Sequence, residues 1–378
     1  MRLGHSMNQQ RNYTKLIDCK MNPNIYEFAH TEYAQDAFIA WMCSCYDRST
    51  NPFKRQIAEK FIKELLGVNV DIQSVEVKTQ EKNIDILLNL NDGQYYVIIE
   101  DKKYSSIHDQ QLRKYVESLK KKDILESQIF VVYYKTGHIS STPNCIYFRN
   151  GYYYSDASKP SEKQEVQQVK QSFPELSGLK ICSIHEINSF FQSVSDLIKK
   201  SGSEILEDYA AAIQCQYKQY MASSVDAKEG RRDEIWGKIF DDFIINVAKP
   251  KYKNLSFKLD YYSGNYWEIY ITGLIPQDGD EHDFSGPILN VRSDIFEGKT
   301  QRIYFFHLED LPKFEPMKKY TMSMSYVIPW GNFRRQHLNE CNYLGEEVDV
   351  KDINLLLEAI CDEFNRSVIE DGESTFGL

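Results

Sequence analysis

The sequence predicts an α/β (α+β) protein: a central sheet flanked by helices, followed by a smaller α+β domain with an antiparallel sheet. Three observations lead to this prediction. Helical periodicity alternates with short apolar runs of strand length, polar turn segments separate these runs, and the second half holds further strand-length runs between two helices. With 378 residues, 42% of them hydrophobic, the chain can bury a substantial core and form about two domains.

The first regular elements are helices. Residues 1–24 are polar and are expected to form a flexible N-terminal segment. A first helix is predicted over 31–46. A second helix has Asn51 as N-cap and Pro52 at its first position, carries apolar residues at four-residue spacing, and ends at Gly67.

A β-hairpin follows at the centre of the predicted sheet. The polar segment 91–94, Asn-Asp-Gly-Gln, separates two apolar runs and is typical of a hairpin turn. The elements expected here are, in chain order, strands near 70–79, 84–90 and 95–102, a helix near 107–121 and a strand at 129–134.

The rest of the first domain is less regular in sequence. Residues 154–179 are polar and are expected to be a surface excursion. A short strand and two helices then complete a domain of residues 25–222, at 179–183, 185–200 and 203–221. The segment 222–230 is rich in small and polar residues, which predicts a linker.

Residues 231–378 are predicted to form the C-terminal α+β domain. Its expected elements are a helix near 234–248, strands near 254–261, 266–273, 288–292, 302–308 and 319–327, and a closing helix near 351–368. Residues 201–378 contain 19 Lys and Arg against 31 Asp and Glu, whereas residues 1–200 contain 26 against 24. An acidic domain is unsuited to holding a polyanion, so we expect a sensor or interaction domain that recognises a protein, a small ligand or its own copy.

Composition excludes several classes of protein. No apolar run approaches the ~20 residues of a membrane-spanning helix, and the N-terminus lacks a signal-peptide core. A cytoplasmic protein without a membrane partner is expected. The eight cysteines form no Cys-x-x-Cys pair, which disfavours zinc and favours free thiols.

One constellation indicates chemistry. Glu100 and Lys102 share one face of their strand because side chains alternate, and the hairpin can bring Asp85 beside Glu100. Two close carboxylates repel each other unless a cation lies between them, and a hard divalent cation with oxygen ligands is the usual solution. Lys102 could then orient a water or stabilise charge on a phosphate under attack. The pattern predicts metal-assisted phosphodiester hydrolysis.

A plainer interpretation stands beside this one. An acid two residues before a lysine is common, and by itself it indicates a solvated strand edge. The context favours chemistry, because the apolar run 97–99 predicts a buried central strand that ends directly in Glu-Asp-Lys-Lys.

In these motifs the chain resembles the PD-(D/E)xK nuclease superfamily, and within it a bacterial group with the pattern D…IIExK…QL..Y. The matching segments are Asp85-Ile86, Ile98-Ile99-Glu100-Asp101-Lys102 and Gln111-Leu112 with Tyr115. Ile84 stands where the proline of the superfamily name is expected. The resemblance implies a restriction-endonuclease-like core with a mixed central sheet flanked by helices.

The resemblance also implies roles for individual residues. Asp85, Glu100 and the backbone carbonyl of Asp101 would bind Mg²⁺, for which Mn²⁺ would substitute. Gln111 would orient the site, with Tyr115 four residues on along the same helix face. The N-terminal helix would supply Glu32, whose alternative explanation is an acid stabilised by the helix dipole in a first turn.

Basic residues follow the predicted site. Lys103, Arg113 and Lys114 are expected to contact the phosphate backbone of a substrate, together with Tyr115. Lys120–Lys122 form a basic run that is better explained as a solvated helix end.

We therefore expect a Mg²⁺-dependent nuclease that cuts DNA, with a bacterial phage-defence or restriction role by analogy alone. Two alternatives stay open: an inactive nuclease-like scaffold that binds nucleic acid or protein, and an effector kept silent until a protein or small-ligand trigger meets the C-terminal domain. A homodimer is a further open expectation.

Overall fold

The computed structural model describes residues 24–27, 32–81, 83–103, 105–107, 110–143, 146–149, 152–155, 160–222, 224–226, 234–253, 255–262, 266–273, 288–292, 304–306, 347–349 and single helical positions between 353 and 365. The expected flexible segment 1–24 lies outside this range except for its last residue.

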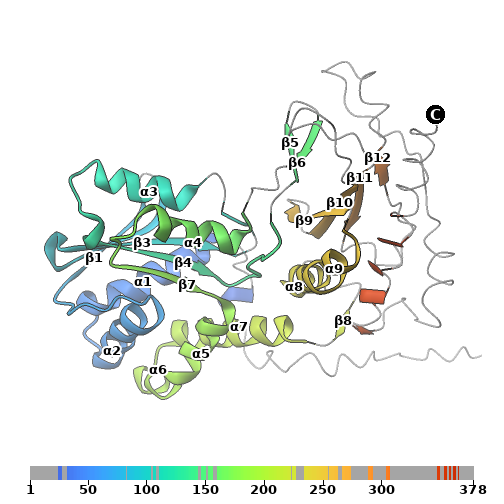
Figure 1. Ribbon diagram of the computed structural model, residues 1–378. Helices are drawn as coiled ribbons and strands as arrows, with labels where there is room; N and C mark the ends of the chain where they lie inside the picture. Colours follow the sequence, from blue (N-terminus) through green and yellow to red (C-terminus); the bar gives the residue numbers. More distant parts are fainter. Residues whose placement is uncertain are drawn as a thin grey trace, which may run out of the picture.

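A mixed five-stranded sheet forms the centre of the first part, in the order β1-β2-β3-β4-β7 (Figure 1). Its strands are β1 (Val75–Glu81), β2 (Ile84–Leu90), β3 (Tyr95–Lys102), β4 (Ile129–Lys135) and β7 (Gly178–Cys182). The pairs β1–β2 and β2–β3 are antiparallel, whereas β3–β4 and β4–β7 are parallel. The predicted mixed α/β core is confirmed.

Helices cover both faces of this sheet. One face packs against α1 (Glu32–Arg48), α2 (Pro52–Lys60), the π-helical η2 (Phe61–Leu65), α5 (Ile184–Ser193), α6 (Ser195–Ser201) and α7 (Glu204–Tyr220), and the other against α3 (Gln111–Lys120) and α4 (Glu162–Ser172). Along β3, Val97 and Ile99 enter the first core while Ile98 enters the second. This alternation assigns Glu100 and Lys102 to the α3 face and Asp101 to the α1 face.

The second predicted helix begins as expected. The Asn51 side chain accepts hydrogen bonds from the backbone N–H groups of Phe53 and Lys54, and Pro52 is the first helical residue. The helix continues through η2, and Gly67 follows with φ of +72°, a left-handed conformation that stops a helix at little steric cost.

A surface excursion was predicted over 154–179, and this prediction was wrong for the described residues 160–179. They contain α4, which Ser161 caps in a capping box with Gln164. The sequence signal is weak because the helix is mostly polar and buries only a narrow stripe that includes Val166 and Val169. A hairpin that was not predicted, β5 (Ile146–Arg149) with β6 (Tyr152–Ser155), precedes it.

Other differences concern boundaries. The predicted strand 70–79 begins only at Val75, the helix near 107–121 begins at Gln111, and the helix near 185–200 is two helices that meet at Val194. These shifts leave the order of elements unchanged.

The second part contains an antiparallel sheet, as expected, in the order β12-β11-β10-β9. Its elements are α8 (Glu234–Phe243), the π-helical η6 (Ile244–Ala248), α9 (Lys249–Lys251), β9 (Leu255–Tyr262), β10 (Tyr266–Gly273), β11 (Ile288–Arg292) and β12 (Tyr304–Phe306). Helical positions at 353–355, 357–358, 361–362 and 365 fall in the predicted closing helix, and the strand predicted at 319–327 lies outside the described residues.

The segment expected to be a linker is not wholly irregular. Within it, β8 (Ser224–Asp226) pairs with β13 (Glu347–Asp349). The domain limits 25–222 and 231–378 stay a prediction. No helix in the described ranges is long and apolar enough to cross a membrane.

Candidate active site

The hairpin of β2 and β3 brings Asp85 beside Glu100. Ile86 pairs with Ile99 in antiparallel register, so Asp85 lies opposite Glu100. Asn91 fixes the turn: its φ is +53°, and its side-chain oxygen accepts hydrogen bonds from backbone N–H groups just before β1. Local turn chemistry thus sets the register that assembles the site.

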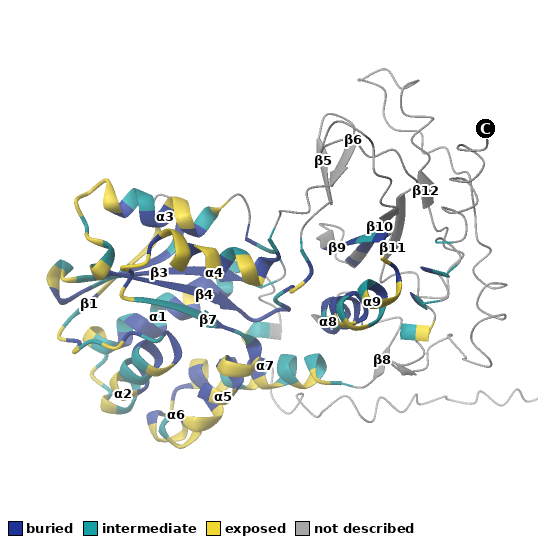
Figure 2. Ribbon diagram, viewed as in Figure 1, coloured by how far each residue is buried: buried dark blue, intermediate teal, exposed yellow. Residues whose placement is uncertain are grey.

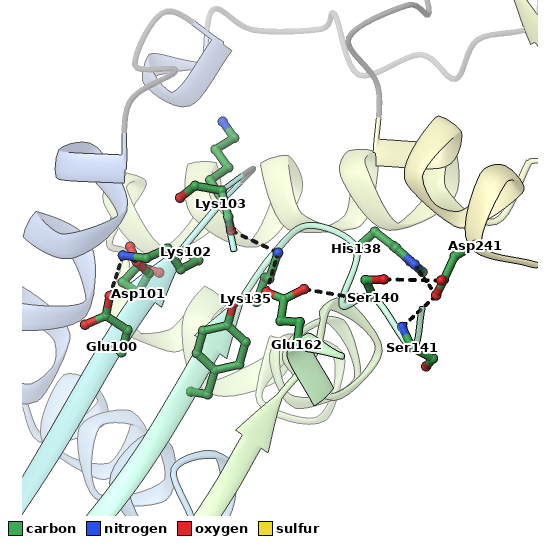
Figure 3. A network of polar contacts seen from close by, with 12 residues as sticks. Glu100, Asp101, Lys102, Lys103, Lys135, His138, Ser140, Ser141, Glu162 and Asp241 are labelled. Carbon is green, nitrogen blue, oxygen red and sulfur yellow. Dashed lines mark hydrogen bonds and ion pairs between the residues drawn. The ribbon is translucent and has the colours of Figure 1, made fainter. Parts of the chain in front are cut away.

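The ammonium of Lys102 lies where three oxygens converge. Its Nζ is 3.5 Å from Oδ2 of Asp85 and 3.0 Å from the backbone carbonyl oxygen of Asp101, and it forms an ion pair with Oε1 of Glu100 (Figure 3). The backbone N–H of Asp101 also donates to Oδ2 of Asp85, at 3.1 Å. Asp85, Glu100 and the Asp101 carbonyl are the oxygens predicted to bind a metal ion.

Burial changes the acidity of these groups. Glu100 is fully buried, and burial, with a further contribution from Asp85, raises the pKa of its carboxyl to about 8 despite the nearby Lys102. Burial alone would lower the pKa of Lys102, but the charges of Glu100 and Asp85 outweigh it and raise that pKa. A cation therefore stabilises the ionised form of the acids at this point.

The oxygen donors fit a hard divalent cation. Among the described residues, neither oxygen of Glu100 accepts a hydrogen bond of good geometry, so this carboxylate retains capacity for a cation. No cluster of three or more His, Cys, Asp or Glu side chains suited to a metal ion occurs in the described ranges. The protein would supply two carboxylates and one carbonyl, and Mg²⁺ usually keeps several water or phosphate ligands.

The arrangement of two acids and a lysine at the end of a hairpin in a mixed sheet agrees with a comparison of sequence families. The family model of the PD-(D/E)XK nuclease superfamily matches residues 6–220, more than half of the chain. The chain belongs to this superfamily. Searches of curated proteins and of solved structures found no match. Members of the PD-(D/E)XK superfamily are generally metal-dependent nucleases that use divalent ions such as Mg²⁺, so a nuclease-like function is supported.

The glutamate carried over from the PD-(D/E)XK superfamily lies beside the end of β3. Oε1 of Glu32 accepts hydrogen bonds from the backbone N–H of Lys103, at 3.1 Å, and from the Ser105 hydroxyl, at 2.7 Å. Glu32 thus holds the segment that follows β3, and these hydrogen bonds are with this segment rather than with Asp85 or Glu100.

Gln111 and Tyr115 form the predicted pair on one face of α3. The amide of Gln111 donates to the Tyr115 hydroxyl, at 2.6 Å, and that hydroxyl donates to the carbonyl of Asn83, directly before β2. Burial, followed by the charge of Glu100, raises the pKa of Tyr115 to about 12. Because Tyr115 is 5% exposed, it supports the start of β2 from inside the protein rather than presenting itself at the surface.

The basic residues predicted to bind phosphate differ in their surroundings. Arg113 and Lys114 are exposed on α3, and Arg113 also pairs with Glu117 on the same helix. Lys103 is partly exposed, and its side chain points away from Glu100 in Figure 3. These three side chains are accessible to a ligand, whereas Lys102 is largely buried.

Sequence reasoning missed two residues of α1 near the site. The buried Gln35 donates from its amide to Oδ1 of Asp101, at 2.5 Å. Asp36 is 7% exposed, and burial, then Asp85, raises its pKa to about 6. The available signal was their spacing: they follow Glu32 by three and four residues and therefore share its helix face.

Proposed function

We propose that this protein is a Mg²⁺-dependent nuclease, with Mn²⁺ as a substitute ion, that hydrolyses phosphodiester bonds of DNA at the Asp85, Glu100 and Lys102 site. The observation that supports it most is the position of the Lys102 ammonium, which lies against Asp85, Glu100 and the Asp101 carbonyl. A site that already holds a cation with two carboxylates and a carbonyl has the donors for a divalent ion.

Each group has a distinct task in this proposal. Asp85, Glu100 and the Asp101 carbonyl hold the ion, which supplies the positive charge that stabilises a phosphoryl transition state. With an ion bound to these acids, Lys102 would no longer pair with them, and its ammonium would orient the attacking water and offset charge on the phosphate. Gln111 and Glu32 would support the site indirectly. Gln111 acts through the Tyr115 hydroxyl, and Glu32 acts through the backbone after β3.

Exposed cations next to the site support a polyanionic substrate. Arg113 and Lys114 on α3, with Lys103 at the end of β3, would contact phosphates without reading bases. Tyr115 is not an accessible contact, and its proposed task is to support β2. The choice of DNA and a role in phage defence or restriction are proposals from the superfamily.

The test is a cleavage assay on plasmid DNA, linear DNA and RNA with Mg²⁺ or Mn²⁺. We compare wild type with Asp85→Asn, Glu100→Gln and Lys102→Gln. The matched control is Asp92→Asn, an exposed acid at the opposite end of the same hairpin. Loss of DNA cleavage in the three site variants, with full activity in the control, would support the proposal. Cleavage that persists in all three would refute it.

A silent wild type requires a second measurement. Calorimetric titration with Mn²⁺ separates a switched enzyme, which binds the ion through Asp85 and Glu100, from an inactive scaffold, which does not. Cytoplasmic location, a homodimer and a trigger at the C-terminal domain stay predictions.

A further inference from the structure

The loop of residues 136–143, which we call the β4 loop, leaves the sheet beside β3. The Thr136 N–H donates to the Lys102 carbonyl, at 3.3 Å, and the Thr136 hydroxyl donates to Oε1 of Gln35, at 2.9 Å. Gln35 in turn donates to the Asp101 carboxylate. The start of the β4 loop is thus bonded directly to Lys102 and, through Gln35, to Asp101.

The other end of the β4 loop is held by one buried carboxylate of α8. Oδ1 of Asp241 accepts from the N–H and hydroxyl of Thr142, and Oδ2 accepts from the Ser141 N–H, at 2.8 Å. Nε2 of His138 lies 2.9 Å from Oδ2, and the Ser140 hydroxyl donates to Oδ1 (Figure 3). Asp241 is 3% exposed and lies beyond the residues matched by the family model.

These bonds favour a charged Asp241. Burial alone would raise the pKa of this carboxyl, but hydrogen bonds and charge from His138, with further donors in the β4 loop, hold it below its ordinary value. The N–H of Ser141, the N–H of Thr142 and the hydroxyl of the buried Thr142 are all aimed at this anion. Its removal would take away an acceptor that these three donors share and would leave the Thr142 N–H only the Ser140 hydroxyl. The β4 loop would then have to rearrange.

A second connection leads from the β4 loop to the segment that follows β3. Glu162 of α4 accepts from the Ser140 N–H through Oε2, at 2.9 Å, and pairs through Oε1 with Lys135, at 2.7 Å. Lys135 donates onward to the carbonyl of Ser105, at 3.0 Å. Ser105 is the residue whose hydroxyl holds Glu32.

We propose that Asp241 is a positioning residue for the active site, contributed by the C-terminal part of the chain. It fixes the β4 loop. This loop aligns the Glu-Asp-Lys segment through Thr136, and it aligns Ser105 through the pair Glu162–Lys135. The consequence for the reaction rests on the proposed nuclease function. The structural coupling does not.

The test compares Asp241→Asn with Asp242→Asn in the full-length protein. Asp242 is the next residue of α8 and is exposed, so it controls for the same chemical change on the same helix. Amide hydrogen exchange is measured on folded protein without metal. In Asp241→Asn we expect exchange to become at least about tenfold faster in 101–107 as well as in 136–143, while β1 and β2 keep wild-type exchange and the control changes neither segment.

Exchange that accelerates only in α8 and the β4 loop would overturn the proposal, because Asp241 would then join two parts without reaching the site. If Asp241→Asn does not fold, Thr142→Val removes one donor to the carboxylate and keeps the side-chain shape. The same pattern of exchange, smaller in size, is then expected, and wild-type exchange in 101–107 would overturn the proposal.

A second measurement addresses the proposed reaction. Mn²⁺ affinity should fall about tenfold in Asp241→Asn with unchanged stoichiometry, since groups that orient metal ligands typically affect affinity to this extent. Partial unfolding would instead lower the stoichiometry, and an unchanged affinity counts against the positioning role. If wild type binds no Mn²⁺, the nuclease proposal fails, and hydrogen exchange alone decides the coupling.

Discussion

Lys102 and a divalent ion would compete for the same carboxylate oxygens. Its ammonium pairs with both Asp85 and Glu100, and a divalent ion would bind those carboxylates in its place. Lys102 thus offsets charge beside the buried Glu100 and the partly exposed Asp85. In the proposed mechanism its ammonium would become available to the substrate when an ion is bound. Both tasks follow from one position at the end of β3.

Lys102→Gln should separate binding from chemistry. Mn²⁺ affinity should equal or exceed that of wild type because the competing ammonium is gone, whereas cleavage should fall by about 10²–10³-fold, the usual effect of losing a donor that stabilises the transition state. Calorimetry and a cleavage assay measure the two quantities. The control is Lys121→Gln, an exposed lysine just after α3. Weaker Mn²⁺ binding in Lys102→Gln would contradict this account.

Glu100 is expected to reduce stability at high pH. Its folded pKa of about 8 lies above the ordinary value of 4.5, so the folded state holds a proton that the unfolded chain has released. Below pH 4.5 the carboxyl is protonated in both states and the destabilisation is absent. It grows as the pH rises from 4.5 to about 8 and is complete above that pH.

Glu100→Gln cannot lose that proton. In chelator, the variant should match wild type near pH 4.5 and exceed it at pH 9 by about 1–3 kcal/mol. Each pKa unit corresponds to about 1.4 kcal/mol, and the loss of the ion pair between Glu100 and Lys102 reduces the gain. Urea unfolding at both pH values measures the difference. A variant less stable than wild type at pH 9 would show that the ion pair with Lys102 dominates instead.

At the scale of elements, α4 supplies a buried ion-pair partner to β4, which its polar sequence does not predict. Its first residue, Glu162, pairs with Lys135 at the end of β4, and both side chains are almost completely buried. The Tyr133 hydroxyl also donates to this carboxylate. A short polar helix therefore supplies the counter-charge for a lysine inside the sheet.

Removing that counter-charge should be costly. Glu162→Gln leaves the Lys135 ammonium buried without an anion, and such changes cost about 3–5 kcal/mol. Thermal and urea unfolding measure the loss, with Glu175→Gln, an exposed acid after α4, as control. Adding Lys135→Met to Glu162→Gln should recover part of the stability. An effect of Glu162→Gln no larger than the control would refute the role of the pair.

At the scale of the whole molecule, the acidic second half contacts the nuclease-like half through specific groups. Besides Asp241, Nζ of Lys238 lies 5.5 Å from the ring centre of Tyr220, and the His138 ring meets the Trp267 ring edge to face. A buried, charged contact of this kind is expensive to break because it leaves unpaired donors.

The two halves should therefore stay together when the chain is cut between them. A protease site inserted after Ala227 would yield two fragments that still co-elute in size-exclusion chromatography. Asp241→Ala should separate them after cutting, whereas Asp242→Ala should not. Fragments that separate in the wild-type background would show that the covalent connection, and not Asp241, holds the halves together.

The sequence by itself determined the hairpin and the three groups at its end. Asn91 and its neighbours encode the turn, strand alternation assigns Glu100 and Lys102 to one face, and the short turn leaves little freedom in register. Such signals extend over a few residues and can be read without the fold. The same reasoning predicted the N-cap of α2 and the glycine that follows η2, but it missed α4. The buried stripe of α4 is so narrow that its sequence resembles that of a polar loop.

Only the tertiary structure decided what surrounds that hairpin. Gln35 meets Asp101 across 66 positions of sequence, Lys135 meets Glu162 across 27, and Asp241 meets Ser141 across 100. No local pattern encodes these pairs, because each depends on how separate helices pack on the sheet. Isolated polar residues at such positions look solvated in the sequence, and their burial against one partner is a property of the assembled fold.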